Sequence, residues 1–434
     1  MAHPKLNVPP TDHLYERPFT SEDYLREETY RYTRNAVESA VTLIPDAYTS
    51  PEFFLLEQQK VFASSWVPVG CVSDVRLPGE AIVTKVAGQS VIVTRDQEGQ
   101  LRAFYNVCRH RGARLMDEGC QKIERFVRCP YHNWAYDLKG NCLGTPLFTG
   151  SDIPQEMEGI FDMSDIKKFD KADYGLYPIN VDSWGFLVLV NLESDPVSLA
   201  EQLGDLPKRC LNYRLEEWEV VREKVYHIKA NYKLIGENFM EYYHLPWVHP
   251  ELVKVSRMEH HYRWQGPGMY NGMTTTPISQ NTDDGGWLDL PPLSTLTSSE
   301  HKAARFIWLF PNVAINVLPN HCFIMITEPI APGYTVETTR ILLPPESARS
   351  PARERALDGL GRFWDLVNMQ DVEIVERVQD GLSTSAYEGG RMCFKFEEPL
   401  HRFQNMIIDR LVGKYRIPPG DEDEDAPMFT NANE

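Results

Sequence analysis

Residues 108–132 read CRHRGARLMDEGCQKIERFVRCPYH and contain two short groups of cysteine and histidine. The first group is Cys108 and His110, and the second group, after eighteen intervening residues, is Cys129 and His132. Each group offers one thiolate and one imidazole, and two such groups on separate loops can close a compact metal site. The sequence therefore predicts a metal centre in this part of the chain.

Two kinds of metal centre use these four ligands. In a Rieske-type [2Fe–2S] cluster, two thiolates hold one iron and two neutral imidazoles hold the other. A zinc site can use the same side chains, but zinc fingers normally pair cysteine with cysteine and histidine with histidine. Because each group here carries one cysteine and one histidine, the pattern favours the iron–sulfur cluster. A zinc-stabilised binding protein without catalysis is the alternative from another class.

A second motif lies at the end of a helix predicted over residues 232–245. Glu237, Glu241 and His244 are spaced at i, i+4 and i+7, so they share one helix face. A proline at 246 disfavours helical geometry in the residue before it, which places His244 on the last turn and His249 in the loop beyond. Two histidines and one carboxylate form the facial triad of non-heme Fe(II) oxygenases. A carboxylate from elsewhere in the chain is therefore expected.

The third ligand is predicted on a helix over residues 364–380, where Asp371 is the carboxylate on the apolar stripe. That stripe is formed with Val367, Ile374, Val375 and Val378, and the polar stripe opposite consists of Gln370, Glu373, Arg377 and Asp380. A carboxylate on a buried face needs a cation or strong donors to stay charged, and Fe(II) would supply that cation. The alternative is an aspartate paired with a basic neighbour.

Both motifs resemble those of the Rieske non-heme iron oxygenases, in their alpha (oxygenase) component. The sequences NVCRHRG at 106–112 and CPYHNW at 129–134 are similar to the cluster signature, and ExxHx₄H at 241–249 resembles the mononuclear iron motif. There are two departures: Asn133 stands where glycine is customary, and the spacer between the groups is slightly longer than usual. The combined resemblance covers residues 66–411 and is greatest to the choline, betaine and carnitine monooxygenase branch of the ring-hydroxylating oxygenases.

The resemblance implies the site residues, the cofactors and the partners. It implies a [2Fe–2S] cluster on Cys108, His110, Cys129 and His132, and a mononuclear Fe(II) on His244, His249 and Asp371. It also implies that Glu241 bridges the centres toward His132 of a neighbouring subunit in a homotrimer. The substrates would be O₂ and a small organic molecule, and the electron donor an NAD(P)H-dependent reductase or a ferredoxin.

Residues 231–250 and 305–312 resemble the choline and betaine branch more than the ring-dihydroxylating branch. This resemblance implies monooxygenation of a quaternary ammonium compound, such as a relative of choline, betaine or carnitine. An aromatic ring hydroxylating dioxygenase or O-demethylase is the alternative. A trimethylammonium group is usually held against aromatic faces. The candidate walls are Tyr242, Tyr243, Trp264, Tyr270, Trp308 and Phe310.

Composition excludes several other functions. The net charge of −18 repels phosphate backbones and anionic lipid surfaces, so we expect neither nucleic acid nor a membrane as partner. No apolar run approaches the roughly 20 residues that span a bilayer, and the N-terminus lacks a signal-like segment, which predicts a cytoplasmic protein. Basic residues nevertheless crowd around the cluster motif and would suit an acidic electron donor. These are Arg109, Arg111, Arg114, Lys122, Arg125 and Arg128.

The predicted fold is α+β in four segments. Residues 1–65 form a lead segment that packs on the catalytic domain, with a helix over 21–40. Short β-rich runs broken by glycine over 66–167 indicate a small all-β Rieske domain. Residues 168–419, opened by a strand at 185–191, form the catalytic domain, whose antiparallel sheet the resemblance implies to wrap around a long C-terminal helix. A lid is expected within 281–299 and an acidic tail over 420–434.

Overall fold

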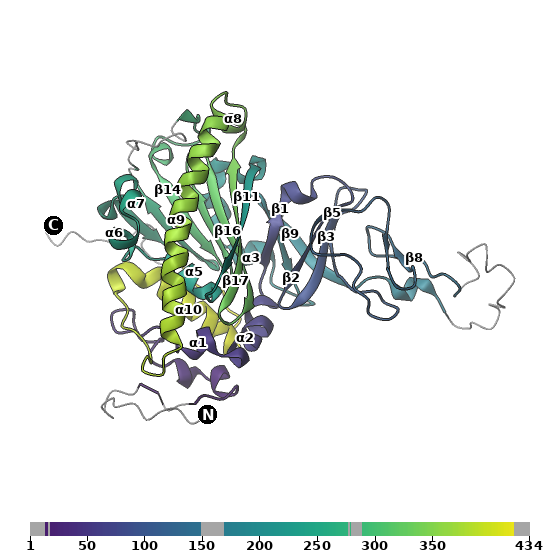
Figure 1. The fold of residues 1–434 in the computed structure, drawn as a ribbon, viewed down its shortest axis with the longest axis horizontal. Helices are drawn as coiled ribbons and strands as arrows, with labels where there is room; N and C mark the ends of the chain where they lie inside the picture. The colour runs from purple at the N-terminus through teal and green to yellow at the C-terminus, as the bar shows by residue number, and fades with distance from the viewer. Residues whose placement is uncertain (1–13, 16–17, 149–168, 277, 279–288, 421–434) are drawn as a thin grey trace. The chain divides into compact units, whose positions relative to one another are not determined.

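The computed structural model describes the chain except for residues 1–13, 16–17, 149–168, 277, 279–288 and 421–434. The acidic tail from residue 421 onward and residues 281–288 of the expected lid therefore lie outside the described residues. The chain divides into two compact units (Figure 1). The smaller unit is Ala63–Pro196, and the larger unit combines Met1–Phe62 with Val197–Glu434.

The smaller unit is built on a seven-stranded antiparallel sheet in the order β1-β10-β9-β4-β3-β2-β5. The strands are β1 (Val67–Cys71), β2 (Glu80–Val86), β3 (Gln89–Arg95), β4 (Leu101–Tyr105), β5 (Gly119–Lys122), β9 (Pro178–Trp184) and β10 (Leu187–Asn191). A second, three-stranded sheet contains β6 (Val127–Arg128), β7 (Ala135–Tyr136) and β8 (Cys142–Gly144). Between β2 and β3 the chain turns in two residues, Ala87 and Gly88, both with positive φ, as tight hairpins require.

The end of the smaller unit differs from the sequence prediction. The strand β10 was expected to open the catalytic domain, but it pairs with β1 and β9 in the sheet of the smaller unit. The unit therefore ends at Pro196 rather than at residue 167. All five residues of β10 are buried, and a continuous apolar run does not specify which sheet a strand joins.

The larger unit contains a seven-stranded antiparallel sheet in the order β11-β17-β16-β15-β14-β13-β12. The strands are β11 (Glu219–Ile228), β12 (His261–Trp264), β13 (Tyr270–Thr275), β14 (Ala304–Leu309), β15 (Val313–Val317), β16 (Cys322–Ala331) and β17 (Tyr334–Leu343). Residues 304–317 form two strands, β14 and β15, and the chain turns back between them at Pro311. Proline cannot donate to a strand ladder, so pairing is interrupted there.

Helices accompany this sheet, and the long helix α9 (Arg353–Leu382) runs along it (Figure 1). The other helices are α1 (Asp46–Thr49), α2 (Pro51–Glu57), α3 (Leu199–Leu203), α4 (Leu206–Arg209), α5 (Tyr232–Phe239), α6 (Leu245–Val248), α7 (Pro250–Val255), α8 (Pro345–Ala348) and α10 (Phe394–Leu411). The helix predicted over 21–40 is wrong: two 3-10 turns, at Asp23–Leu25 and Glu27–Tyr30, are found there. None of the described helices is both long and apolar enough to cross a membrane.

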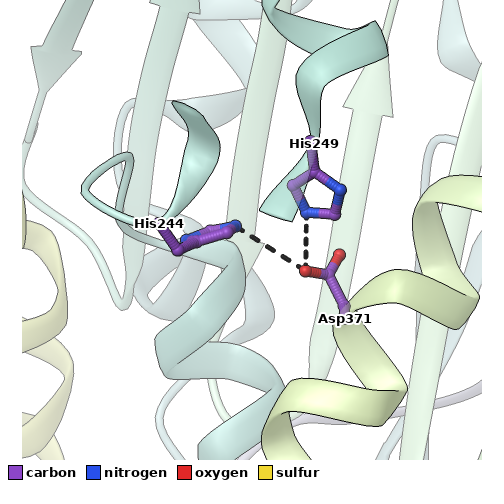
Figure 2. Close-up of side chains that lie close together, drawn as sticks. All are labelled: His244, His249 and Asp371. Carbon is purple, nitrogen blue, oxygen red and sulfur yellow. Dashed lines mark hydrogen bonds and ion pairs between the residues drawn. The ribbon is translucent and has the colours of Figure 1, made fainter. Parts of the chain in front are cut away.

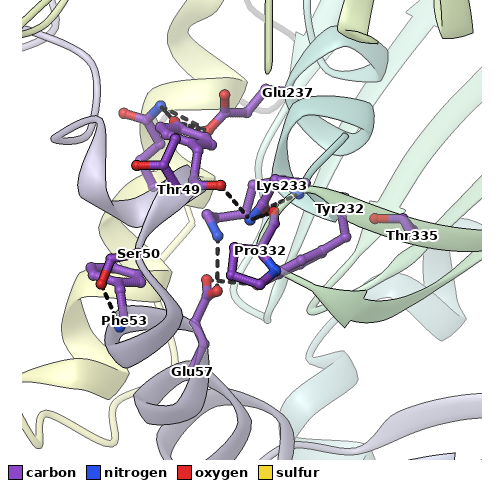
Figure 3. Close-up of polar contacts among 12 residues, drawn as sticks. Thr49, Ser50, Phe53, Glu57, Tyr232, Lys233, Glu237, Pro332 and Thr335 are labelled. Atoms are coloured by element: carbon purple, nitrogen blue, oxygen red, sulfur yellow. Dashed lines mark hydrogen bonds and ion pairs between the residues drawn. The ribbon is translucent and has the colours of Figure 1, made fainter. Parts of the chain in front are cut away.

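A buried polar network joins the N-terminal segment to α5 (Figure 3). Lys233 Nζ lies 2.8 Å from Glu57 Oε2, and both side chains are 0% exposed. Tyr232 also donates to Glu57, at 3.0 Å, and Tyr48 donates to Glu237 at 2.7 Å. Because a buried charge without a partner is strongly destabilising, these contacts fix α5 against residues 48–57. Residues 1–62 thus belong to the same compact unit as the sheet and α9.

Candidate functional site

His244, His249 and Asp371 lie together in the larger unit (Figure 2). His249 Nε2 is 2.7 Å from Asp371 Oδ1, and His244 Nε2 is 3.6 Å from the same oxygen. One ligand atom from each residue can be chosen so that all lie within 4.8 Å of one another. The structure therefore brings together the two histidines and the carboxylate that the sequence singled out.

The local path of the chain to the histidines differs from the prediction. Helix α5 begins where Asn231 accepts the Lys233 N–H at 3.0 Å, and it ends at Phe239, before either histidine. Glu241 then accepts the backbone N–H groups of Tyr243 and His244, which stabilises the turn into α6. His244 is the residue before α6, and Pro246 lies in the first turn of that helix rather than ending one.

Glu237 does not join the histidines, although the predicted helix placed it on their face. Its Oε1 accepts from Tyr48 and, at 2.9 Å, from Gln404 Nε2. Burial raises the pKa of Glu237 to about 7, against the opposing effect of these two donors. Its role in the described structure is to bind the N-terminal segment and α10 to α5.

Each histidine of the triad is held through its Nδ1 by a side chain. Glu241 Oε1 is in short contact with His244 Nδ1, and Gln370 Oε1 lies 2.8 Å from His249 Nδ1. Nε2 of each ring is then the nitrogen that faces Asp371. Such second contacts usually orient metal-binding imidazoles. The sequence prediction did not include Gln370 in the site, because it assigned this residue to the polar stripe of the helix. Its position directly before Asp371 was the sequence feature that could have indicated its role.

The chemistry of this donor set fits a divalent metal. Burial alone would lower the pKa of His244. The neighbouring carboxylates of Glu241 and Asp371 together outweigh that effect, so the pKa is raised above its usual value. Without a cation, each short contact between an imidazole nitrogen and a carboxylate oxygen would need a hydrogen on that nitrogen. Two nitrogens and one carboxylate oxygen, with other positions open, are the ligands that non-heme Fe(II) oxygenases use.

A pocket opens beside the triad, between the sheet, α5 and α9. Its aromatic walls are Phe239, Tyr242, Phe306, Phe323 and Trp364, and its polar lining includes Asn238, Ser256, Asn316 and Asn368. Of the six walls predicted from sequence, Tyr242 alone lines it. Trp264, Tyr270, Trp308 and Phe310 are buried elsewhere, and Tyr243 is exposed. Phe306 and Trp308 share one face of β14, but Trp308 packs against Phe239 and Phe403. Position along the strand, which the sequence does not give, therefore decides that Phe306 reaches the pocket.

The cysteine and histidine motifs form two matching loops in the smaller unit. The Cys108 N–H donates to the Ala113 carbonyl at 2.8 Å, and the Cys129 N–H donates to the Trp134 carbonyl at 2.7 Å. The ring centroids of His110 and His132 are 4.6 Å apart. Burial raises the pKa of Cys108, and the neighbouring Cys129 thiol acts in the same direction.

The residues at these loops fit an iron–sulfur cluster. His110 Nδ1 is buried and, among the described residues, has no hydrogen-bond partner, as expected of a nitrogen reserved for a metal. His110 stacks on Trp134, with centroids 4.9 Å apart, and the hydroxyl of Tyr136 lies 3.3 Å from Cys108 Sγ. Two thiols and two imidazoles therefore converge within one protected pair of loops.

The basic residues near these loops divide into two groups. Arg109 donates to the Gly175 carbonyl at 2.6 Å and covers the Tyr177 ring, so it has a structural role. Arg114 forms an ion pair with Asp117 at 2.6 Å. The remaining four, Arg111, Lys122, Arg125 and Arg128, are exposed. All four can be reached by a partner, although Arg111 also donates to the Tyr131 hydroxyl at 3.4 Å and Arg128 to Asn133 Oδ1 at 3.2 Å.

Comparison with known proteins identifies both units. Residues 65–155 match the model of the Rieske [2Fe-2S] domain, and residues 215–413 match that of the ring hydroxylating alpha subunit (catalytic domain). The glycine betaine monooxygenase oxygenase subunit of Chromohalobacter salexigens is 26% identical, with 85% of each chain covered. The carnitine monooxygenase oxygenase subunit of Acinetobacter pittii is also 26% identical, over 79% of this chain and 85% of its own.

A solved structure, the quaternary ammonium Rieske monooxygenase CntA, has a similar fold. The TM-score is 0.73 at 22% sequence identity, with 88% of this chain and 98% of that chain covered. At this identity the likeness concerns the fold. It agrees with the predicted combination of a Rieske domain with a mixed domain of helices and antiparallel sheet.

Proposed function

We propose that this chain, which belongs to the Rieske non-heme iron oxygenases, monooxygenates a small quaternary ammonium compound. Its Rieske domain binds a [2Fe–2S] cluster and its catalytic domain binds a mononuclear iron. As an oxygenase subunit it uses O₂, a small-molecule substrate and electrons from a separate reductase. The relatives named above act on glycine betaine and carnitine, which places the proposal within their substrate class.

The observation that carries the ammonium assignment is the composition of the pocket. Five aromatic side chains line it, together with the carboxylates of Glu241 and Asp371. Its described lining contains no lysine or arginine. An aromatic face attracts a cation by about 0.5–2 kcal/mol, depending on desolvation. Because Asp371 is also the proposed iron ligand and Glu241 contacts His244, it is the aromatic walls, without lysine or arginine in the described lining, that suit a permanent cation.

The residue roles form part of the proposal. Cys108, His110, Cys129 and His132 would hold the cluster, and His244, His249 and Asp371 would hold the iron. When bound, the iron supplies dioxygen activation with electrons that the cluster delivers. The chain's own residues then orient these ligands: Glu241 and Gln370 hold the two Nδ1 atoms. The aromatic walls would exclude water and hold the substrate's methyl groups near the open side of the triad.

We also propose that the chain works as a homotrimer in which Glu241 links the iron site to His132 of a neighbouring subunit. Two aromatic residues beside the triad support an interface there: Trp247 is 81% exposed and Tyr243 is 53% exposed. The structure of CntA gave insights into inter-subunit electron transfer in that protein. An NAD(P)H-dependent reductase or a ferredoxin would dock near the exposed basic residues of the Rieske domain. The cytoplasmic location stays a prediction.

Substrate-dependent oxygen uptake tests the proposed function. The iron-loaded protein with a surrogate reductase should consume O₂ in step with product formation when given choline, glycine betaine or carnitine. The neutral isostere 3,3-dimethylbutanol, which has the shape of choline without its charge, should give little uptake. Coupled turnover of neutral aromatic compounds alone would show that the chain hydroxylates or demethylates arenes instead. Iron and sulfide analysis with visible absorption separates either enzyme from a zinc-stabilised binding protein.

A further inference from the structure

Helix α9 forms one wall of the pocket, from the triad to the opposite end. Trp364, Val367, Asn368 and Asp371 all line the pocket, and no residue of α9 before Trp364 belongs to the described lining. Trp364 and Asp371 are seven residues apart, almost two turns, so their side chains lie on the same helix face. The helix rise places Trp364 about 10 Å along the axis from Asp371. Trp364 therefore bounds the pocket at the end away from the triad.

The indole of Trp364 is held by a stacking contact and by a hydrogen bond. Its ring stacks on Phe323, with centroids 4.6 Å apart and an angle of 6° between the planes. Its Nε1 donates to His321 Nε2 at 3.2 Å. Trp364 is buried, and a buried indole N–H group needs an acceptor. His321 supplies that acceptor, and it is buried outside the described lining of the pocket.

His321 can accept because its neighbours fix its hydrogen on the other ring nitrogen. Asn320 Nδ2 donates to the Leu290 carbonyl oxygen at 3.0 Å, which identifies the nitrogen end of this amide. The oxygen end, Asn320 Oδ1, lies 2.9 Å from His321 Nδ1. Since an amide oxygen only accepts, Nδ1 carries the hydrogen and Nε2 keeps its lone pair. Burial lowers the pKa of His321 to about 3, which keeps the ring neutral.

The backbone that carries His321 is itself held by hydrogen bonds. His321 lies in the tight turn between β15 and β16, where the Leu318 N–H donates to the His321 carbonyl oxygen at 2.9 Å. The Leu293 N–H donates to the Pro319 carbonyl oxygen of the same turn, also at 2.9 Å. The acceptor for Trp364 therefore stands on a hydrogen-bonded turn, which defines its position relative to α9.

We propose that His321 is a positioning residue of the substrate pocket, which fixes the Trp364 indole at the far end and so limits the length of the substrate. This inference rests on the proposed function and deepens it. A ligand too long for the pocket has to push the indole aside, which breaks its bond to His321 and leaves a buried N–H without an acceptor. A ligand that ends before Trp364 needs no such movement. Discrimination by length then depends on the acceptor at residue 321.

Two probes of different length test this inference on the iron-loaded enzyme. Butyltrimethylammonium and octyltrimethylammonium carry the same head group and differ only in the alkyl chain. The wild type should prefer the shorter compound, and His321→Leu should reduce that preference by about tenfold, the usual effect of one buried hydrogen bond. His321→Gln, whose amide oxygen can accept, should restore part of it. The change should appear in KM for the longer compound, whereas kcat for the shorter one should stay nearly constant because the triad is untouched.

A double-mutant cycle with Trp364→Phe shows whether His321 acts through the indole. Phenylalanine has no N–H group, so adding His321→Leu to this variant should cause no further change in the length preference. An equal effect of His321→Leu in both backgrounds would overturn the inference. Calorimetric titration of the iron-free protein measures the same preferences as dissociation constants, without turnover. NMR of protein labelled at its nine tryptophans should show the Trp364 indole N–H signal displaced in His321→Leu and returned toward its original position in His321→Gln.

The remaining outcomes separate this inference from the proposed function. Asn320→Ala removes the oxygen that fixes the tautomer, so it should reduce the length preference too, and it provides a second test if His321→Leu folds poorly. A wild type without length preference, or an unchanged preference in folded His321→Leu, would overturn the inference and keep the proposed function. Turnover of neutral compounds alone would overturn the proposed function. Butylbenzene and octylbenzene, with the same variants, would then decide the role of His321 by itself.

Discussion

Gly112 and Asn133 occupy the same position in the two cluster loops, four residues after the cysteine, with φ of 72° and 60°. In the first loop the Gly112 N–H donates to the Cys108 carbonyl oxygen, and in the second the Asn133 N–H donates to the Cys129 carbonyl oxygen, both at 3.0 Å. The position thus requires the left-handed conformation, which glycine adopts freely and asparagine tolerates better than most residues. This explains how Asn133 can replace the glycine that the motif customarily carries.

The first prediction concerns that position. Asn133→Gly should keep the cluster and the stability of the protein, whereas Asn133→Val should destabilise the Rieske domain by about 2 kcal/mol, because a branched side chain is strained at positive φ. Thermal denaturation followed by the visible absorption of the cluster measures both effects. Equal melting of the valine and glycine variants would mean that the loop relaxes and that the conformation is not required.

The second prediction concerns Gln370. Gln370→Ala removes the acceptor of His249 Nδ1, so the ring loses its fixed orientation and iron affinity should fall by about 10–100-fold. Competition with a chelator measures this affinity without turnover. Glu373→Ala is the matched control, because Glu373 lies on the same helix and pairs with Arg377 at the surface. Unchanged affinity in the Gln370 variant would assign the residue a packing role only.

The third prediction concerns electron transfer through Glu241. Glu241→Gln should keep both metals and bind substrate, since an amide oxygen can still accept from His244. Oxidation of the reduced cluster in a single turnover should slow by about tenfold or more, because the charged link between the centres is lost. Glu251→Gln, at a surface pair with Lys254, serves as the control. Normal single-turnover oxidation would count against the bridging role.

The fourth prediction concerns the buried pair of Lys233 and Glu57. Lys233→Met should lower the free energy of unfolding by about 3–5 kcal/mol, because it leaves the Glu57 carboxylate buried without its cation. Adding Glu57→Gln to this variant should restore much of the loss, since Tyr232 can still donate to the amide oxygen. Denaturant unfolding of the two single variants and the double variant measures the coupling. Additive losses would show that the pair does not act as a unit.

The fifth prediction concerns pH. Burial raises the folded-state pKa of Glu237 from 4.5 to about 7, so the folded protein holds this proton more tightly than the unfolded chain. The corresponding stability is complete below pH 4.5 and is lost as the pH rises through 7, a change of about 3 kcal/mol. Glu237→Gln should remove that loss, so its advantage in melting temperature over the wild type should be larger at pH 8 than at pH 5.

The exposed Glu22→Gln variant controls for the general effect of removing a negative charge from this acidic protein. A constant difference between Glu237→Gln and the wild type across the same pH range would mean that Glu237 titrates near its usual value in the folded state.

The sequence alone determined the parts of this protein that lie close together along the chain. Cys108 with His110, and Cys129 with His132, are each brought together by one short loop, so their spacing was enough to predict them as ligands. His244 and His249 are likewise separated by a single turn of helix. Asp371 was selected by helical periodicity, because one helix face determines which carboxylate can point inward.

Only the tertiary structure decided which distant segments meet. The pairing of β10 with β1, the contact of Gln370 with His249, and the walls formed by Phe306, Phe323 and Trp364 join residues far apart in sequence. Local periodicity gives the inward face of a strand or helix but neither the register nor the partner, because these depend on how whole elements pack.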